Sequence, residues 1–422
     1  MTTIDAPLGQ RNFTDETGVG GRIKVRPEDF IVEEIPLYEP SGEGEHLYLR
    51  IEKRSVAHGE LMSRLRRTFG VSHTDIGYAG MKDKHAVTRQ TVSIHLREDP
   101  PSIDIDHERI NVLWAARHRN KIKRGHLRGN RFGIRIRDVD PLRVVSAQRT
   151  LRQLERTGVP SYYGPQRFGY RRNNHLMGIY LLRGEWSAAL DELLGSRGSA
   201  FPEYQRERRE AYDAGRYETL PEMWSTADRA ELIASKALRG GATPHEAIRV
   251  IGGTTLDFFV SSTASAMFNR ILDRRIDAGT VDQLAMGDVA WKHDSRAAFL
   301  VTGSEIESGE LPGRLERFEI SPSGPLWGRG VLRAEGAVDE LERAAVTEMG
   351  LDVDTITGSR NRPVGSRRAF RVPIENTEIE GGHDEEGTFI RVMFDLPRGM
   401  FATVVLQELM KNGPVDASQR GS

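Results

Sequence analysis

Hydrophobic and polar positions alternate along several stretches of the chain. In residues 46–53, Leu47, Leu49 and Ile51 fall on one side of an extended chain, and mostly polar residues fall on the other. This is the period of a half-buried β-strand. The same alternation recurs in residues 90–96, 110–114, 134–136 and 389–396. The pattern therefore predicts strands towards both ends of the chain.

A helical period replaces this alternation elsewhere. Leu61, Leu65 and Phe69 recur at every fourth position, and Gly70 follows them. This spacing predicts an amphipathic helix over residues 57–69 that ends in a glycine cap. Helical periods also dominate residues 173–239, 258–276, 338–349 and 402–411.

The distribution of these elements predicts two domains. The ends of the chain are rich in strands and the middle is rich in helices, which is typical of an α+β domain interrupted by a second domain. We place the first domain at residues 1–160 and 367–422, and the inserted domain at residues 161–366. Within the insertion, residues 321–328 contain two prolines and predict a rigid turn.

Composition excludes several classes of protein. The chain has no cysteine, which removes disulfides, thiol nucleophiles and thiolate metal sites. Its histidines show no metal-binding spacing, and neither a phosphate-binding loop nor a dinucleotide-binding motif is present. The sequence has no apolar run long enough to span a membrane and no signal-peptide pattern at its start. We therefore expect a cytoplasmic protein without a membrane segment.

Charge is unevenly distributed along the chain. The formal net charge is -1, which argues against a uniformly basic nucleic-acid-binding protein. Nevertheless, the residues from Arg117 to Arg137 include nine lysines and arginines and no acidic residue. We interpret this basic run as a loop between strands that suits phosphate contacts, with a merely solvated surface as the alternative. Acidic residues crowd residues 375–386, which we interpret as a solvated hairpin tip.

Aromatic residues and arginines are interleaved in residues 160–172, which include Tyr162, Arg167, Phe168 and Tyr170. Such a segment can stack on bases and bind phosphates. Aromatic-rich turns also serve as hydrophobic plugs in protein cores. The segment by itself leaves both interpretations open.

An aspartate between two lysines is the strongest candidate for chemistry. Residues 77–90 read Gly-Tyr-Ala-Gly-Met-Lys-Asp-Lys-His-Ala-Val-Thr-Arg-Gln, which predicts a strand, a tight charged turn and a second strand. Asp83 lies in the turn, where Lys82 and Lys84 would hold its carboxylate ionised near neutral pH. Taken alone, the same residues describe an ordinary solvated turn.

Five motifs that occur in order along the chain change this balance. They read K-x-R-P-E-D-F at residues 24–30, G-M-K-D-K-H-A-V-T-R-Q at 80–90, G-H-L-R-G-N-R-F at 125–132, Y-G-P-Q-R-F-G at 163–169 and L-P-R-G-M-F-A-T at 396–403. Together they resemble the TruD family of tRNA pseudouridine synthases. Because the motifs cover both ends of the chain, the resemblance concerns the whole protein.

The resemblance implies both a fold and an activity. The fold is the pseudouridine-synthase catalytic fold, a mixed and largely antiparallel sheet with flanking helices, plus an inserted α/β TRUD domain, the two framing a cleft for RNA. The activity is that of an isomerase that converts a specific uridine of tRNA, typically at position 13, by breaking the N1–C1′ bond and rejoining the base through C5. Proteins of this family use no cofactor and no metal, so tRNA is the expected partner.

The resemblance also implies the site residues. By position, Asp83 takes the role of the catalytic aspartate, and the residues that align around it are Lys24, Phe30, Lys82, Asn130, Phe132 and Phe401. A uridine flipped out of its stack needs an apolar surface, which Phe132 and Phe401 could supply, and Asn130 offers a donor and an acceptor to the uracil edge. Whether Asp83 attacks C1′ or C6, or removes the C2′ proton, stays open.

Each surrounding residue also has a structural explanation. Phe30 and Phe401 suit core packing, Lys24 suits a strand surface, and Asn130 suits a turn. For the whole chain, an RNA-binding protein without catalytic activity and a metal-dependent nuclease compete with the isomerase. The aspartate of the second motif favours the isomerase, and the nuclease lacks a carboxylate or histidine cluster in the sequence.

Overall fold

The computed structural model describes residues 11–358 and 363–411 of the 422-residue chain. The described chain divides into two compact units. We call residues 12–159 and 372–411 the sheet unit, and residues 160–358 and 363–371, with residue 11, the middle unit. The short strands β7 (Val159–Pro160) and β12 (Arg371–Val372) lie where the chain passes from one unit to the other.

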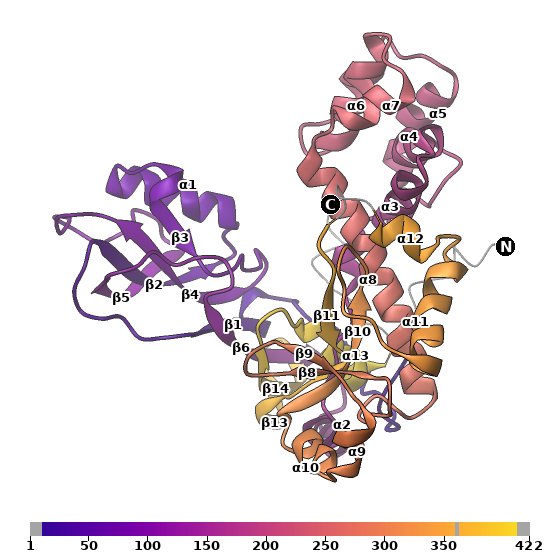
Figure 1. The fold of residues 1–422 in the computed structure, drawn as a ribbon. Coiled ribbons are helices and arrows are strands. Elements are labelled where there is room, and N and C mark those ends of the chain that lie inside the picture. Colours follow the sequence, from indigo (N-terminus) through magenta and orange to yellow (C-terminus); the bar gives the residue numbers. More distant parts are fainter. Residues whose placement is uncertain (1–10, 359–362, 412–422) are drawn as a thin grey trace. The chain divides into compact units, whose positions relative to one another are not determined.

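An eight-stranded sheet forms the centre of the sheet unit (Figure 1). Its strands run in the order β13-β14-β6-β1-β4-β2-β5, with β3 beside β4. Their bounds are β1 (Phe30–Pro36), β2 (His46–Arg54), β3 (Ile76–Tyr78), β4 (Val87–His95), β5 (Ile110–His118), β6 (Leu127–Arg137), β13 (Glu375–Asp384) and β14 (Gly387–Pro397). Among the described strand pairs of this sheet, only β1 with β4 is parallel. The expected mixed, largely antiparallel sheet is therefore confirmed.

Helix α1 (His58–Phe69) covers one face of this sheet near β2, β3 and β4 (Figure 1). Its Leu61 and Leu65 are fully buried and belong to one hydrophobic cluster with Leu49 and Ile51 of β2. The helix ends at Gly70, which has a φ of 63°. This left-handed conformation costs glycine little because glycine has no Cβ. The amphipathic helix predicted from the spacing of leucines is confirmed.

The other α-helices of the sheet unit lie near the β13 edge of the sheet. Helix α2 (Val144–Thr157) packs against β13 and against α13 (Ala402–Met410). Alternate residues of β6 and β14, among them Ile134, Ile136 and Val392, are fully buried. The period of two seen in the sequence thus marks the side of each strand that contributes to the core.

Helices dominate the middle unit and accompany a four-stranded sheet in the order β11-β10-β8-β9. The helices are α3 (Asn174–Arg183), α4 (Trp186–Leu194), α5 (Arg206–Asp213), α6 (Arg229–Arg239), α7 (Pro244–Arg249), α8 (Gly253–Asp277), α9 (Gly303–Glu307), α10 (Leu311–Glu316), α11 (Gly336–Glu348) and α12 (Val353–Thr357), and the strands are β8 (Val289–Lys292), β9 (Ala298–Leu300), β10 (Ile320–Leu326) and β11 (Ser366–Ala369). The long helix α8 packs against α3, α11 and β10. Among the described residues, no helix has the length and apolar character needed to cross a membrane.

The proline-containing segment expected to be a rigid turn is a strand instead. Residues 320–322 of β10 pair with β8, whereas residues 323–326 pair with β11. Each half of β10 therefore pairs with a neighbouring strand along one edge only, and its other edge has no partner strand in these pairings. A proline, which has no N–H to donate, is tolerated at such a position. The two neighbouring strands that make this arrangement possible leave no sign in the local sequence.

Glycine is required at one position where β6 approaches β14. A Cβ on Gly129 would lie 2.3 Å from the carbonyl oxygen of Leu396. We expect Gly129→Ala to push the two strands apart and to lower the free energy of unfolding, measured by urea denaturation, by about 1–3 kcal/mol.

Gly133 on the same strand is the matched control. A Cβ there would lie 3.7 Å from its nearest neighbour, the Cβ of Ile31, which is ordinary contact. Gly133→Ala should leave the free energy of unfolding unchanged or raise it by up to about 1 kcal/mol, since alanine loses less conformational entropy than glycine. Equal effects of the two substitutions would contradict the close approach at Gly129.

Candidate active site

Asp83 lies in the loop that joins β3 to β4. The carbonyl of Ala79 accepts a hydrogen bond from the Gly125 amide at 2.8 Å, and the carbonyl of Ala86 accepts one from the Ser55 amide at 3.1 Å. The loop is thus held near both ends by other segments of the sheet unit, while the Asp83 side chain stays 46% exposed. A carboxylate that is exposed on a held main chain suits a group that must meet a substrate.

Lys24 is the cation beside the Asp83 carboxylate. Its Nζ lies 3.5 Å from Asp83 Oδ2 and 4.6 Å from the ring centre of Phe30. Lys24 has a φ of 56°, a left-handed conformation that is uncommon outside glycine. Phe30 is buried at the first position of β1. The structure therefore brings Asp83, Lys24 and Phe30 together, as their motifs imply.

Lys82 pairs with a buried carboxylate rather than with Asp83. Its Nζ lies 2.9 Å from Glu34 Oε2, and both side chains are almost fully buried. Glu34 also accepts a hydrogen bond from the Thr91 amide. The expectation that Lys82 and its neighbour Lys84 hold the Asp83 carboxylate is corrected here, because within the described residues only Lys24 forms an ion pair with it. A buried carboxylate needs a partner charge more than an exposed one does.

Lys53 also contacts the loop, although no motif pointed to it. The residue is fully buried, and its Nζ donates hydrogen bonds of 2.7 Å to the carbonyls of Val56 and Asp83. Burial lowers the pKa of Lys53 to about 8, an effect that the charge of Asp83 opposes and that of Lys82 reinforces. One signal could have revealed it: position 53 continues the alternating apolar face of β2, where a charged residue is unusual.

Asn130 and Phe132 lie on β6, opposite β1. The register pairs Glu34 with Asn130 and Val32 with Phe132, so these side chains share one face of the sheet. Phe132 is buried, and its ring centre lies 5.4 Å from that of Phe394. Asn130 Oδ1 is buried and has no hydrogen-bond partner among the described residues. This oxygen is therefore a buried acceptor whose hydrogen-bonding capacity the described residues do not use.

Phe401 immediately precedes α13 and is 39% exposed. The segment before it is tied to the start of β6 and to the connection that precedes this strand. The Arg398 amide donates to the Arg128 carbonyl at 3.0 Å, and the Arg398 guanidinium donates to the carbonyl of Gly125. The Gly125 amide in turn donates to the carbonyl of Ala79. Two successive hydrogen bonds therefore connect the motif at residues 396–403 to the loop that carries Asp83.

The basic run is not the loop that was expected from its sequence. Arg117 belongs to β5, and the run from Arg128 to Arg137 belongs to β6, so that only residues 119–126 connect the two strands. Within β6, Gly129 allows a close strand approach to β14, and Gly133 lies in the same regular strand rather than in a flexible loop. Acidic residues from other segments pair with five of the cations, in the pairs Arg117–Asp99, Arg119–Glu43, Arg131–Asp395, Arg135–Asp384 and Arg137–Asp29.

The remaining cations of the run form no ion pair within the described part of the chain. They are Lys121, Lys123, Arg124 and Arg128, of which the last three are exposed. The Arg124 guanidinium donates to the Tyr78 hydroxyl at 3.1 Å. Because Tyr78 ends β3 directly before the loop of the candidate aspartate, uncompensated positive charge lies beside that loop. Such charge suits contacts with phosphate groups.

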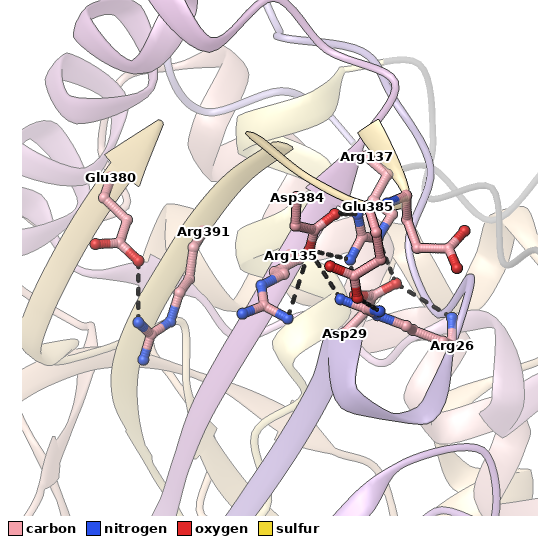
Figure 2. A network of polar contacts seen from close by, with 9 residues as sticks. Arg26, Asp29, Arg135, Arg137, Glu380, Asp384, Glu385 and Arg391 are labelled. Carbon is pink, nitrogen blue, oxygen red and sulfur yellow. Dashed lines mark hydrogen bonds and ion pairs between the residues drawn. The ribbon is translucent and has the colours of Figure 1, made fainter. Parts of the chain in front are cut away.

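A network of ion pairs anchors the segment that carries Lys24 (Figure 2). Arg137 donates to both carboxylate oxygens of Asp29, at 2.6 and 2.7 Å, and both side chains are fully buried. Arg137 also donates to Asp384 at 2.7 Å, and Arg26 donates to the same carboxylate at 2.8 Å. The turn Pro27–Asp29 is therefore fixed to β6 by a bidentate, charge-assisted contact.

The acidic segment at residues 375–386 forms a hairpin of β13 and β14, but its tip is not simply solvated as expected. Asp384 binds Arg137, and Glu385 lies 2.5 Å from Arg26. The Arg137 guanidinium holds the pKa of Asp384 well below its usual range. A buried arginine needs carboxylates close by, and the hairpin supplies one of them.

In the middle unit, the aromatic and arginine-rich segment at residues 160–172 mainly contributes to the core. Tyr162 and Phe168 are fully buried, and Arg167 donates hydrogen bonds to Ser261 and Ser265 of α8. Tyr170, in contrast, is exposed. The interpretation as a hydrophobic plug therefore describes most of this segment.

The arrangement in the sheet unit allows specific chemistry. An exposed carboxylate beside an ammonium group can act as a nucleophile or as a base. A buried amide oxygen without a partner can select a ligand that donates a hydrogen bond. Within residues 11–358 and 363–411, no group of three or more histidine, aspartate or glutamate side chains is arranged to hold a metal ion.

Comparison with solved structures identifies the class of fold. The chain resembles the crystal structure of a putative tRNA pseudouridine synthase D from Methanosarcina mazei, with a TM-score of 0.81 and 27% sequence identity. The match covers 96% of this chain and 97% of that one. The mixed α+β architecture is therefore that of a pseudouridine synthase.

Comparison of sequences shows the family. The family model described as tRNA pseudouridine synthase D (TruD) matches residues 8–409. A protein named tRNA pseudouridine synthase D from Geobacter metallireducens is 40% identical over 403 residues, which are 94% of this chain and 97% of that protein. One of the same name from Thermus thermophilus is 34% identical over 406 residues, covering 95% and 92% of the two chains. The chain belongs to the TruD family, as its five motifs indicated.

The buried ion-pair network gives a prediction about stability. Asp29→Asn should lower the free energy of unfolding by about 3–5 kcal/mol, because it leaves the buried Arg137 guanidinium with one carboxylate fewer. Urea denaturation of the purified variant measures this loss.

The control is an exposed ion pair on the hairpin of β13 and β14. Glu380 lies 3.0 Å from Arg391, and the two side chains are 59% and 38% exposed (Figure 2). Glu380→Gln should change the free energy of unfolding by less than about 1 kcal/mol, since water screens the pair. An Asp29→Asn variant that is as stable as Glu380→Gln would show that the network does not anchor the turn.

Proposed function

We propose that the protein converts a uridine of tRNA to pseudouridine and that Asp83 is its catalytic residue. The observation that carries this proposal is the exposed Asp83 carboxylate, on a loop held near both ends, 3.5 Å from the Lys24 ammonium. Membership in the TruD family, with relatives named tRNA pseudouridine synthase D, supports the reaction and the substrate class. We further propose position 13 of tRNA as the target, and the middle unit as the inserted TRUD domain.

The reaction rearranges the nucleoside without changing its composition. The N1–C1′ bond breaks, a C5–C1′ bond forms, the proton leaves C5 and N1 gains a proton. An ionised carboxylate can attack C1′ or C6, or can remove the C2′ proton, and each of these roles needs the negative charge that the Lys24 ammonium stabilises. Since the base must turn over, the uridine has to leave its stack and enter the site as a flipped nucleotide.

The other residues that the resemblance assigns to the site suit a flipped uridine. Asn130 Oδ1, buried and without a partner among the described residues, can accept a hydrogen bond from uracil N3–H. Phe401 is exposed enough to stack on the base. Phe132, packed on Phe394, supports the strand that carries Asn130. Lys82 contributes by neutralising Glu34, the residue opposite Asn130.

Replacing the proposed catalytic carboxylate separates catalysis from binding. Asp83→Asn should lower the rate of pseudouridine formation in unmodified tRNA transcripts by roughly 10³-fold or more, because an amide is neither a nucleophile nor a base. Carbodiimide mapping of the product RNA measures the yield and the position. The affinity of Asp83→Asn for tRNA should stay close to that of the wild-type protein.

Asp257→Asn on the exposed surface of α8 serves as the control and should retain full activity. Persistent turnover by Asp83→Asn would refute the assignment of Asp83. A wild-type protein that binds tRNA but forms no pseudouridine would favour the competing interpretation, an RNA-binding protein without catalytic activity. Pseudouridine formed only away from position 13 would refute the proposed target.

The exposed cations without an ion-pair partner beside the loop should bind the phosphate backbone of the RNA. Replacing Lys123, Arg124 and Arg128 together by glutamine should weaken tRNA binding. It should also reduce the slope of log Kd against log salt by about 0.7–0.9 for each phosphate group that the variant no longer neutralises. Fluorescence anisotropy over a salt series measures both quantities.

The matched control replaces Arg117 and Arg119, which already pair with Asp99 and Glu43. These cations have partners within the protein, so their replacement by glutamine should change the salt slope much less. An unchanged slope in the triple variant would place the RNA backbone elsewhere.

A further inference from the structure

Lys53 is fully buried at the last buried position of β2, against the main chain of Asp83. Two of its three N–H groups donate to the carbonyls of Val56 and Asp83, each at 2.7 Å. In the part of the chain that the structure describes, no carboxylate lies within ion-pair distance of its Nζ. Two main-chain carbonyls therefore hold the ammonium group directly, next to the proposed catalytic loop.

The charged groups around Lys53 come from the loop and from α1. The loop contributes Asp83 and Lys82, and α1 contributes His58, whose pKa is lowered by burial and further by the charge of Lys53. Lys82 is already paired with Glu34. Asp83 is thus the one group in this set whose negative charge can balance the charge of Lys53.

Stability does not explain why the residue is a lysine. The pKa of Lys53 falls from 10.5 to about 8 on burial, so that between these pH values the unfolded chain binds more protons than the folded one. Stability then rises with pH through this window, which means that the charge on Lys53 opposes folding at neutral pH. An apolar residue at this position would avoid that cost.

We infer that Lys53 is a positioning residue for the reaction: its ammonium group holds the main chain of Asp83 and supplies, from the buried side, the positive potential that stabilises the reacting carboxylate. Lys24 provides a second ammonium group at the carboxylate itself. This inference rests on the proposed function of Asp83. It assigns a role to a residue outside the five motifs.

The absence of cysteine from the chain permits a direct test. Lys53→Cys introduces a single thiol, and alkylation with bromoethylamine in denaturant followed by refolding converts it to aminoethylcysteine, an analogue of lysine whose amine is more acidic. Lys236→Cys, at an exposed position of α6, is treated in the same way as the control. Single-turnover rate constants are then measured from pH 6 to pH 10 by tritium release from tRNA that carries 5-tritiated uridine.

The expected results follow from the charge. The wild-type rate constant should fall as the pH rises through about 8, where Lys53 loses its proton. Lys53→Met should lower the rate constant at pH 7 by roughly 10²-fold, remove this alkaline fall and leave the Kd for tRNA unchanged. Aminoethylated Lys53→Cys should restore the rate constant, with the alkaline fall displaced to lower pH. The aminoethylated control should match the wild type.

Two results would overturn the inference. One is a Lys53→Met variant that folds, by circular dichroism and Tm, and keeps the wild-type rate constant. The other is an aminoethylated Lys53→Cys protein whose rate constant falls at the same alkaline pH as that of the wild type. This second result would refute the inference even if Lys53→Met fails to fold. Failure of the proposed function is seen separately, as an inactive wild type or an active Asp83→Asn variant.

Discussion

The sheet unit depends on the pairing of β6 with β1 on one side and with β14 on the other. Phe132 on β6 lies between Val32 and Phe394, so that the first and last parts of the chain become neighbours across one strand. Backbone hydrogen bonds of such a ladder contribute only modestly one by one, but the register that they set decides which side chains meet. Asn130 faces Glu34, and through Glu34 it is linked to Lys82.

Buried charges then set the positions of the segments attached to this sheet. Arg137 and Asp29 fix the turn that follows Lys24, while Glu34 and Lys82 fix the residue that precedes Asp83. A buried ion pair adds little net stability in comparison with apolar packing, but breaking it is costly. Such pairs therefore serve specificity, since they admit one arrangement of the loop and exclude others. The result is an exposed carboxylate that lies between a fixed Lys82 and the Lys24 ammonium group.

Much of this fold could be predicted from local pattern. Alternating apolar residues predicted β2 and β6, and the leucine spacing with Gly70 predicted α1. These predictions succeeded because a strand or a helix at the edge of a core buries one face, and the spacing of apolar residues shows which face it is. The five motifs indicated the family and predicted that Lys24, Phe30 and Asp83 belong to one active site. The errors share one cause. The segment around Pro322, the basic run and the partner of Lys82 all depend on residues that are distant in sequence.

The sequence by itself determined the elements, the family and the identity of the candidate carboxylate, because periodicity and motif spacing are local properties of the chain. Only the tertiary structure decided the partners. Within the described residues, it divided nine neighbouring cations into five with an ion-pair partner and four without one. It also gave Lys82 to Glu34 rather than to Asp83, and placed Lys53 against the Asp83 main chain. The physical reason is burial: a charged group that leaves water must find a partner in space, and the chain order does not say which one.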